Sequence, residues 1–326
     1  MSVVIRAVGS ALPARAVPND DLPASLETSD EWIKSRTGIA QRYIAANDET
    51  TSTLAINAAR SALDNAGLNP EDIDGVIVAT TTPDLTFPAV ATMVQHELGV
   101  PRGTLAFDLQ AVCAGFIYAL GVADGLLQAR RMRRALVIGA ETMTRLLNWE
   151  DRTTCVLFGD GAGAVVLEIE EGLDALSGPA PRGIIDLQMN ADGSLIDILH
   201  TKGGPSRTQD VGHLHMAGKE VFRHAVEKMS SAVLTLLDAH GFTPEDVKWY
   251  VPHQANQRIL AAVAARIGAP PERFISTVAA HANTSAASIP LALHELERSG
   301  GLRRGDLMVM AGLGGGLAWG ATLLRW

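Results

Sequence analysis

The chain has 326 residues, enough for one large or two modest domains, and its 47% hydrophobic and 19% charged residues are typical of a globular protein. Acidic residues spread along the chain give a formal net charge of −9, which argues against general nucleic-acid binding. The two cysteines, Cys113 and Cys155, are too few for a disulfide framework or a CxxC metal site.

The N-terminal stretch MSVVIRAVGSALP lacks the basic region and apolar run of a signal peptide. Together with the sparse cysteines, this leads us to expect a cytoplasmic protein. One uncharged stretch, residues 307–324, approaches the length of a membrane span. Its five glycines fit two buried strands joined by a glycine turn better, so we expect no membrane partner.

Strand and helix patterns alternate through the first half of the chain. A short helix after Ser29 carries Trp32 and Arg36 about one turn apart, which suits an adenine and its phosphates but also an ordinary surface helix. Residues 151–163, rich in glycine, are expected to form loops and turns. The predicted strands are residues 3–8, 75–80, 104–109, 135–139 and 164–169, and the predicted helices are 51–66, 89–98 and 114–127.

The second half repeats this alternation. The motif Gly67-Leu-Asn-Pro-Glu-Asp-Ile-Asp74 returns 174 positions later as Gly241-Phe-Thr-Pro-Glu-Asp-Val-Lys248, each time between a long helix and a strand. Two such copies predict a duplicated α–β–α–β–α architecture, with halves at residues 1–172 and 173–326. The predicted strands are residues 184–189, 249–251, 274–277, 307–313 and 317–324, and the predicted helices are 216–240, 257–267 and one that ends at 298.

Cys113 stands where a predicted strand meets the N-terminus of a buried helix, a place that favours a thiolate. His253 and Asn283 also follow predicted strands, and ligands in such folds lie beyond the carboxyl ends of strands. Each residue alone has an ordinary structural explanation. The three together predict one nucleophilic site, which is either a protease triad or a thioester-condensing site in which His and Asn both donate to a developing enolate oxygen.

Six long motifs are spread along the chain: SDEWIKSRTGI (29–39), LQAVCAGFIYAL (109–120), FGDGAGAVVL (158–167), VPHQAN (251–256), NTSAASIP (283–290) and GGGLAWG (314–320). With these motifs the sequence resembles the β-ketoacyl-[acyl-carrier-protein] synthase III family of the thiolase superfamily. The resemblance covers essentially the whole chain and implies the duplicated, five-layer thiolase-like α/β fold.

The resemblance implies an acyltransferase that condenses a short acyl-CoA, typically acetyl-CoA, with malonyl-acyl-carrier protein in the first condensation of fatty-acid synthesis. Cys113 would carry the acyl group, and His253 and Asn283 would assist decarboxylation. The backbone N–H groups of Cys113 and Gly315 would form the oxyanion hole. Both thioesters are substrates, so the resemblance implies no cofactor and no metal.

Further residues receive roles from the same resemblance. Phe87 would reach across a homodimer interface to close the acyl pocket, which Leu313 would also line, and Arg258 would help receive the acidic carrier protein. The residues expected to bind CoA are Trp32, Arg36, Thr37, Arg152, Gly218 and Asn256.

Two positions depart from the family pattern. Ala282 stands where a glycine is usual, and Leu313 where a phenylalanine often lies beside the malonyl site. Thiolases need a second catalytic cysteine, and none follows Cys155. Elongating ketoacyl synthases use a second histidine where this chain has Asn283, and plant-type polyketide synthases carry a GFGPG element that is absent here.

Three other classes remain for comparison. The duplicated fold argues against a cysteine protease. A relative that transfers acyl groups or condenses starters in secondary metabolism is the main alternative. A non-enzymatic scaffold protein with this fold is the third alternative, and such a protein would tolerate the loss of Cys113.

Overall fold

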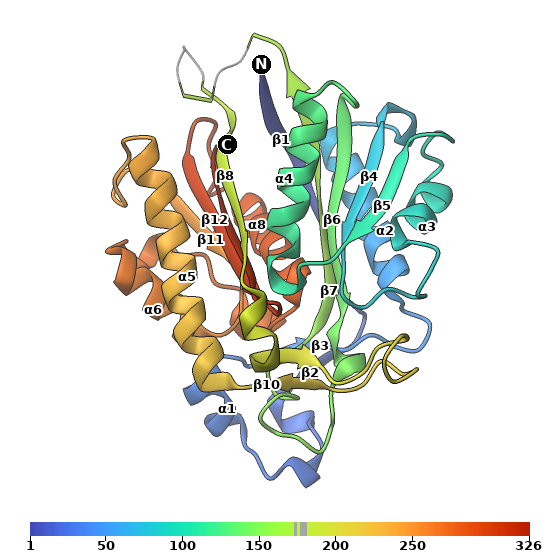
Figure 1. Ribbon diagram of the computed structural model, residues 1–326, viewed down its shortest axis with the longest axis vertical. Helices are drawn as coiled ribbons and strands as arrows, with labels where there is room; N and C mark the ends of the chain where they lie inside the picture. Colours follow the sequence, from blue (N-terminus) through green and yellow to red (C-terminus); the bar gives the residue numbers. More distant parts are fainter. Residues whose placement is uncertain (173–174, 177–180) are drawn as a thin grey trace.

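The computed structural model describes residues 1–172, 175–176 and 181–326, and its larger sheet has five strands (Figure 1). Strand β4 pairs in parallel with β5 and β6, while β7 runs antiparallel to β6 and β1. In spatial order the strands are β1 (Ser2–Ala11), β7 (Asp160–Glu170), β6 (Arg134–Thr142), β4 (Gly75–Ala79) and β5 (Leu105–Leu109).

The smaller sheet has four strands and repeats this arrangement. Strand β11 pairs in parallel with β12, and β13 runs antiparallel to β12 and β8. Where β5 lies in the larger sheet, Phe274 forms a single parallel bridge with Tyr250 of β11. In spatial order the strands are β8 (Gly183–Ala191), β13 (Ala318–Arg325), β12 (Leu307–Gly314) and β11 (Trp249–Pro252).

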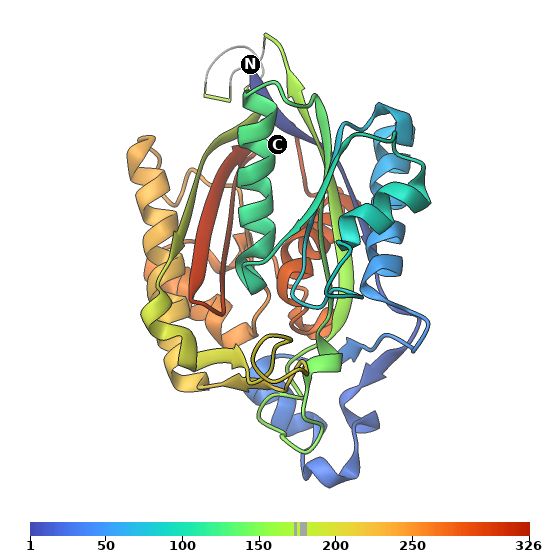
Figure 2. The ribbon, with the colours of Figure 1, turned by 45° about the vertical axis from the view of Figure 1, so that its right-hand side comes forward.

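Two helices lie between the sheets and two pairs cover their outer faces, as Figures 1 and 2 show. The central helices are α4 (Gly115–Gln128) and α8 (Ser288–Arg298). Helices α2 (Thr51–Ala66) and α3 (Val90–Leu98) pack on the larger sheet, and α5 (Gly218–Ala239) and α6 (Gln257–Ile267) on the smaller. The five layers confirm the predicted α–β–α–β–α architecture.

The central layer shares one hydrophobic core with both sheets. Phe116 and Leu120 of α4 and Leu293 of α8 belong to the same cluster as Val137 of β6 and Met310 of β12. A helix buried on both sides must be apolar around its whole circumference, which explains the composition of α4. Each such side chain contributes roughly 1.5–3 kcal/mol by its burial.

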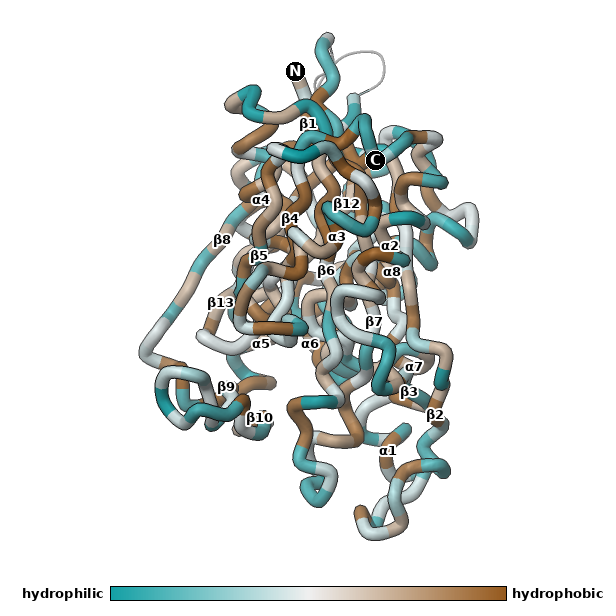
Figure 3. Tube along the Cα trace, turned by 90° about the vertical axis from the view of Figure 1, so that its right-hand side faces the viewer, coloured by the Kyte–Doolittle hydropathy of each residue, from teal (hydrophilic) through white to brown (hydrophobic). Residues whose placement is uncertain are grey.

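Short elements gather at one end of the molecule, where Figure 3 shows β9 and β10 on one side and α1, β2 and β3 on the other. Strand β9 pairs with β10, and β2 with β3, in two small antiparallel ribbons. Helix α1 begins after Ser29, whose hydroxyl accepts from the Trp32 N–H. The bounds are β2 (Ala16–Pro18), α1 (Asp30–Thr37), β3 (Gln41–Tyr43), β9 (Leu199–Thr201), β10 (Leu214–Met216) and α7 (Val278–His281).

Two predicted elements are wrong. Residues 274–277 do not form a strand. The Ile275 N–H still donates to Tyr250 O of β11 at 2.9 Å, but beyond it the buried Gln254 side chain replaces a strand partner, donating to Ile275 O at 3.1 Å and accepting from the Thr277 N–H at 2.8 Å. The turns expected before residue 164 are partly strand, since β7 begins at Asp160. The glycines there let α8 approach closely, because a Cβ on Gly163 would come within 2.8 Å of Leu291 N.

Other predicted elements match within a few residues. The stretch 307–324 forms the antiparallel pair β12–β13, as expected. Among the described residues, no helix is long and apolar enough to cross a bilayer. The division between residues 172 and 173 stays a prediction, because residues 173–174 and 177–180 lie outside the described part.

Candidate active site

Cys113 lies in the turn that joins β5 to α4. A 3₁₀ turn spans Val112–Ala114, and α4 follows from Gly115. Val112 has a φ of 49°, a conformation that β-branched residues rarely adopt and that marks strain at functional sites. Gly314 of β12 packs against this turn, because a Cβ there would come within 2.5 Å of the Cys113 nitrogen. The cysteine is therefore held where the two sheets meet.

Burial controls the charge state of Cys113. The residue is 5% exposed, and burial raises the pKa of its thiol to about 12. The Ser285 hydroxyl lowers that pKa and the Glu141 charge raises it, but both effects are smaller than burial. Burial therefore opposes the thiolate that the helix terminus is expected to favour, and that expectation stays a prediction.

His253 follows β11 directly and is 3% exposed. Its Nδ1 lies 2.7 Å from the Ser288 hydroxyl, whose oxygen also accepts from the Gln254 N–H at 3.2 Å. Since that oxygen already accepts one hydrogen bond, its own proton can be donated to Nδ1, which leaves the ring proton on Nε2. Burial lowers the pKa of His253 to about 3, so the ring is neutral.

Asn283 follows the short helix α7 rather than a strand, which corrects the sequence-based expectation. Its N–H donates to Leu157 O at 2.9 Å, and its carbonyl accepts from the Gly159 N–H at 3.0 Å. Its side-chain oxygen accepts from the Ser285 N–H at 2.9 Å. Because the amide oxygen is taken up inside the loop, the amide NH₂ is the end left to face the pocket.

Backbone strain surrounds this asparagine. Ala282 has a φ of 57° and a ψ of −156°, a region that essentially only glycine occupies. Ser285 has a φ of 49°. Ala282, which stands where the family usually has glycine, therefore carries a side chain at a position whose backbone conformation favours glycine.

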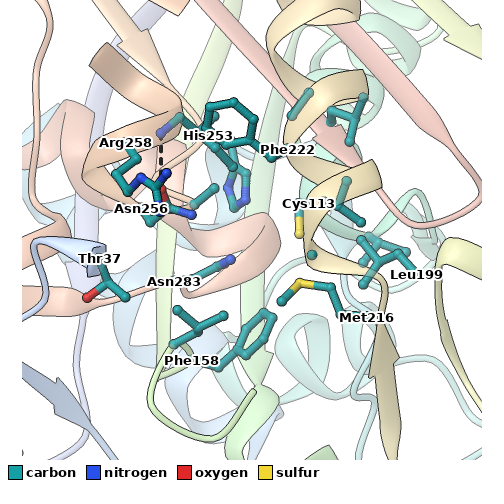
Figure 4. Close-up of a pocket in the computed structure, with 18 of the residues that line it drawn as sticks. Thr37, Cys113, Phe158, Leu199, Met216, Phe222, His253, Asn256, Arg258 and Asn283 are labelled. Atoms are coloured by element: carbon teal, nitrogen blue, oxygen red, sulfur yellow. Dashed lines mark hydrogen bonds between the residues drawn. The ribbon is translucent and has the colours of Figure 1, made fainter. Parts of the chain in front are cut away.

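Cys113, His253 and Asn283 line one cavity of about 380 Å³, and Figure 4 shows the three around a common space. Apolar side chains from α5 and from the β9–β10 end, among them Phe222, Leu199 and Met216, form much of its wall. A mostly apolar cavity with a few polar groups in its lining suits a flexible, mostly apolar arm that presents one reactive group.

The candidates for CoA binding fall into two groups. Four of them line the cavity: Arg36, Thr37, Gly218 and Asn256. Trp32 and Arg152 do not, but they lie together outside it, with the Arg152 guanidinium 5.7 Å and the Arg36 guanidinium 4.6 Å from the centre of the Trp32 ring. Because Arg152 already contacts the ring, a purine between them requires Arg152 to leave its 2.9 Å hydrogen bond with Glu27 O.

The remaining candidates are distributed around the molecule. Leu313 and the exposed Arg258 line the cavity. Phe87 does not, and 82% of it is exposed. Gly315 packs against the backbone of β9, where a Cβ would come within 2.6 Å of Leu199 O. Cys155 is fully buried, as expected, although it lies in a turn rather than a strand.

Sequence reasoning missed three polar residues behind the site. They are Ser288, which contacts His253, and Ser285 and Glu141, whose side chains hydrogen-bond each other at 3.1 Å. The two serines lie within the motif NTSAAS, so their spacing from Asn283 was a usable signal. Among the described residues, no cluster of three or more His, Cys, Asp or Glu side chains could hold a metal ion.

Comparison with known proteins shows which family the chain resembles. Family models described as 3-oxoacyl-[acyl-carrier-protein (ACP)] synthase III and its C-terminal part match residues 107–193 and 237–326. The chain is 56% identical to the beta-ketoacyl-[acyl-carrier-protein] synthase III of Erythrobacter litoralis over 322 residues, which cover 99% of this chain and 98% of that protein.

Two solved structures extend the comparison. The 3-oxoacyl-(acyl carrier protein) synthase III of Pseudomonas aeruginosa is 44% identical, with a TM-score of 0.92 over 100% of this chain and 98% of that one. The priming beta-ketosynthase of the R1128 polyketide biosynthetic pathway is 36% identical, with a TM-score of 0.91 over 99% of this chain and 96% of that one.

Proposed function

This chain belongs to the β-ketoacyl-[acyl-carrier-protein] synthase III family, and on that premise we propose that Cys113, His253 and Asn283 divide a two-step condensation between them. Enzymes of this family are acyltransferases that start fatty-acid synthesis by condensing an acyl-CoA with malonyl-acyl-carrier protein. The starter is a short acyl-CoA such as acetyl-CoA. The observation that carries the proposal is the meeting of the three side chains on one cavity.

In the first step the Cys113 sulfur attacks the acyl thioester, and CoA leaves. The negative oxygen of the tetrahedral intermediate is stabilised by the backbone N–H groups of Cys113 and Gly315. Glycines at 314 and 315 support this role, because a side chain at either position would collide with the backbone of the Cys113 turn or of β9.

In the second step malonyl-carrier protein loses CO₂, and the resulting enolate attacks the acyl group on sulfur. His253 Nε2–H and the Asn283 NH₂ both donate to the enolate oxygen. The hydrogen bonds at the far end of each side chain, from Ser288 and from the Ser285 N–H, support this orientation. Each donor lowers the barrier by roughly 2.7–4 kcal/mol.

The substrates reach Cys113 through the apolar cavity. Arg36, Thr37, Gly218 and Asn256 line the pantetheine and phosphate path, and the Trp32–Arg152 pair opens to receive the adenine. Asn256 already uses its side-chain oxygen to cap α6, accepting from the Ile259 N–H at 3.0 Å, so its NH₂ is available to the ligand. Leu313 lines the acyl end.

Two protein contacts complete the proposal. Phe87, 82% exposed in the single chain, closes the acyl pocket of a second copy in a homodimer. Arg258, at the cavity mouth, receives the acidic carrier protein. We expect Arg258→Glu to weaken the carrier-protein step at least tenfold more than the acyl-CoA step. Equal loss in both steps would remove Arg258 from the docking surface. We place the enzyme in the cytoplasm, and its chemistry needs no cofactor beyond the two thioesters.

Intact-mass measurement tests the central proposal. The protein is incubated with a panel of acyl-CoAs, and malonyl-carrier protein is then added. We expect one acyl group on Cys113 that is discharged by the malonyl partner. Acylation without discharge would favour an acyltransferase with another acceptor, such as a relative in secondary metabolism. Absence of any acylation would refute the proposal for the short-chain starters tested.

A further inference from the structure

The amide of Asn283 is held at its far end by a single neighbour. The backbone of this residue is fixed, because its N–H donates to Leu157 O and its carbonyl accepts from the Gly159 N–H. The side chain points into the cavity (Figure 4), and among the described residues its one hydrogen bond is accepted by Oδ1 from the Ser285 N–H at 2.9 Å. The orientation of the donating NH₂ therefore follows the position of Ser285.

Ser285 adopts a backbone conformation that is unusual for a residue with a side chain. Its φ is 49°, and it is 0% exposed at the start of the 3₁₀ turn that leads into α8. Such a conformation persists where the surrounding structure holds it in place. The Ser285 hydroxyl makes one such contact, because it donates to Oε1 of Glu141, a residue 144 positions earlier in the chain, at 3.1 Å.

Glu141 lies near the carboxyl end of β6, is 0% exposed, and is fixed from its other side. Its second oxygen, Oε2, accepts from the Thr82 hydroxyl at 2.6 Å and from the Thr81 N–H at 3.0 Å. The Thr82 oxygen itself accepts from the Thr142 N–H at 2.8 Å, which leaves the hydroxyl proton for the carboxylate. Because rotation of the carboxylate would leave buried donors unpaired, Glu141 is a fixed anchor for Ser285.

The turn that carries Ser285 fits closely against β6. A Cβ on Gly139 would lie 2.3 Å from Ala286 O, so the absence of a side chain at residue 139 lets the turn reach the strand. Alternate residues of a strand point to the same face, so Glu141 projects from the face of β6 that the turn approaches. The hydrogen bond between Glu141 and Ser285 is therefore part of a close contact between β6 and the start of α8.

We propose that Glu141 is a positioning residue for the decarboxylation step, in which it holds Ser285 and, through the Ser285 N–H, the amide of Asn283. The inference rests on the proposed function, because it requires Asn283 to donate to the enolate oxygen. Glu141 does not line the cavity, so it acts through Ser285 and contacts no substrate. The larger sheet thus places a donor that belongs to the second half of the chain.

The test compares two single-turnover rates, acylation of Cys113 by acetyl-CoA and release of CO₂ from malonyl-carrier protein. Ser285→Ala keeps the backbone N–H but loses the hydrogen bond to Glu141. We expect CO₂ release to slow roughly tenfold, less than the 10²- to 10³-fold effect of a lost donor, with the KM for malonyl-carrier protein unchanged. Acylation should stay within about twofold of the parent rate, because Cys113 is held by β12 rather than by Ser285.

A matched control removes a buried hydroxyl elsewhere. Ser230 of α5 is 0% exposed, does not line the cavity, and has no hydrogen-bond partner for its hydroxyl among the described residues. Ser230→Ala should therefore leave both rates unchanged. A loss of CO₂ release in Ser285→Ala that Ser230→Ala does not share is then specific to the contact with Glu141.

Two further comparisons identify the route. In an Asn283→Ala background the amide is gone, so adding Ser285→Ala should slow CO₂ release no further. Glu141→Leu removes both carboxylate oxygens and should slow CO₂ release at least as much as Ser285→Ala. Glu141→Gln should recover most of that loss, because its oxygen can accept from the two threonines while its NH₂ donates to the Ser285 oxygen.

The outcomes separate this inference from the function on which it rests. CO₂ release at the parent rate in Ser285→Ala overturns the positioning role, as does an equal slowing of acylation. An additional loss in the Asn283→Ala background, or a Glu141→Gln protein as slow as Glu141→Leu, overturns it as well. If Glu141→Leu does not fold, the two Ser285→Ala measurements decide. If Asn283→Ala itself releases CO₂ at the parent rate, the proposed function fails and the positioning role fails with it.

Discussion

The two central helices begin in the same way and serve different steps. Helix α4 follows a 3₁₀ turn at Val112–Ala114, and α8 follows one at Ser285–Ala287. Val112 and Ser285 both have a φ of 49°, although neither is a glycine. The duplication has therefore produced two equivalent turns that meet at the middle of the molecule.

The difference between the turns lies in what each one presents. The turn of α4 holds a sulfur, and the turn of α8 follows Asn283 and holds its amide from behind through the Ser285 N–H. The chain that leads to each turn differs as well. In the first half β5 is a full strand paired with β4, whereas at the corresponding place in the second half only Phe274 forms a bridge, with Tyr250 of β11. One half therefore supplies the nucleophile, and the other supplies the two side-chain donors to the enolate.

The largest effect should come from the α4 turn. Cys113→Ser replaces the nucleophile with a hydroxyl that has no activating base beside it, so acylation by acyl-CoA should fall by at least about 10⁴-fold. Quenched intact mass measures this loss. Malonyl decarboxylation should persist in this variant because its donors lie in the other half. Retained acyl-enzyme would move the nucleophile elsewhere in the chain.

Variants of the two donor residues should impair the second step, decarboxylation, and spare the first step, acylation. His253→Ala or Asn283→Ala should still form acyl-enzyme but should slow decarboxylation roughly 10²- to 10³-fold, the value of one lost donor. Release of CO₂ from malonyl-carrier protein measures this. Full condensation in either variant would show that the two-donor scheme is wrong.

A third prediction concerns the pH dependence of stability on the α8 side. The pKa of His253 is lowered to about 3, so between that value and about 6.5 the unfolded chain binds a proton that the folded chain does not. The stability from this residue is complete above pH 6.5 and is lost as the pH falls. Near pH 5 the loss is about 2 kcal/mol. Urea unfolding at pH 7 and 5 should show His253→Asn losing less stability than its parent.

The smallest effect should come from the strain at Ala282. Ala282→Gly should stabilise the fold by roughly 1 kcal/mol, because glycine adopts its positive φ without a Cβ clash. Ala280→Gly, in the exposed part of α7, is the control and should destabilise by about 0.5–1 kcal/mol. Thermal unfolding measures both. Destabilisation at residue 282 would mean that the methyl group is needed for packing.

Much of the architecture could be predicted from sequence because it depends on local patterns. Alternating strands and helices, and the repeated Pro-Glu-Asp motif, led to two stacked halves. The stretches around Cys113, His253 and Asn283 led to the candidate site. The strand predicted at residues 274–277 is wrong because the side chain of Gln254, rather than the backbone of a neighbouring strand, hydrogen-bonds to Ile275 and Thr277.

The rest depends on burial, which no local pattern encodes. The sequence places Cys113 at a helix terminus, where a thiolate is favoured, but only the folded chain shows how completely the sulfur is enclosed. Glu141 lies near the end of a predicted strand, and the residues next to it in the sequence do not indicate that the Ser285 hydroxyl donates a hydrogen bond to it. Contacts between polar groups far apart in the sequence could therefore not be predicted from it.

The shared core described for α4 and α8 also governs how the protein unfolds. Neither sheet keeps a covered inner face without the two helices, and each helix packs against residues of both sheets. Losing either half would expose apolar surface of the other, so calorimetry should record one transition in which the measured and van't Hoff enthalpies agree. The nucleophile and its two donors would then be lost together on heating, with no partly melted form that still accepts acyl groups.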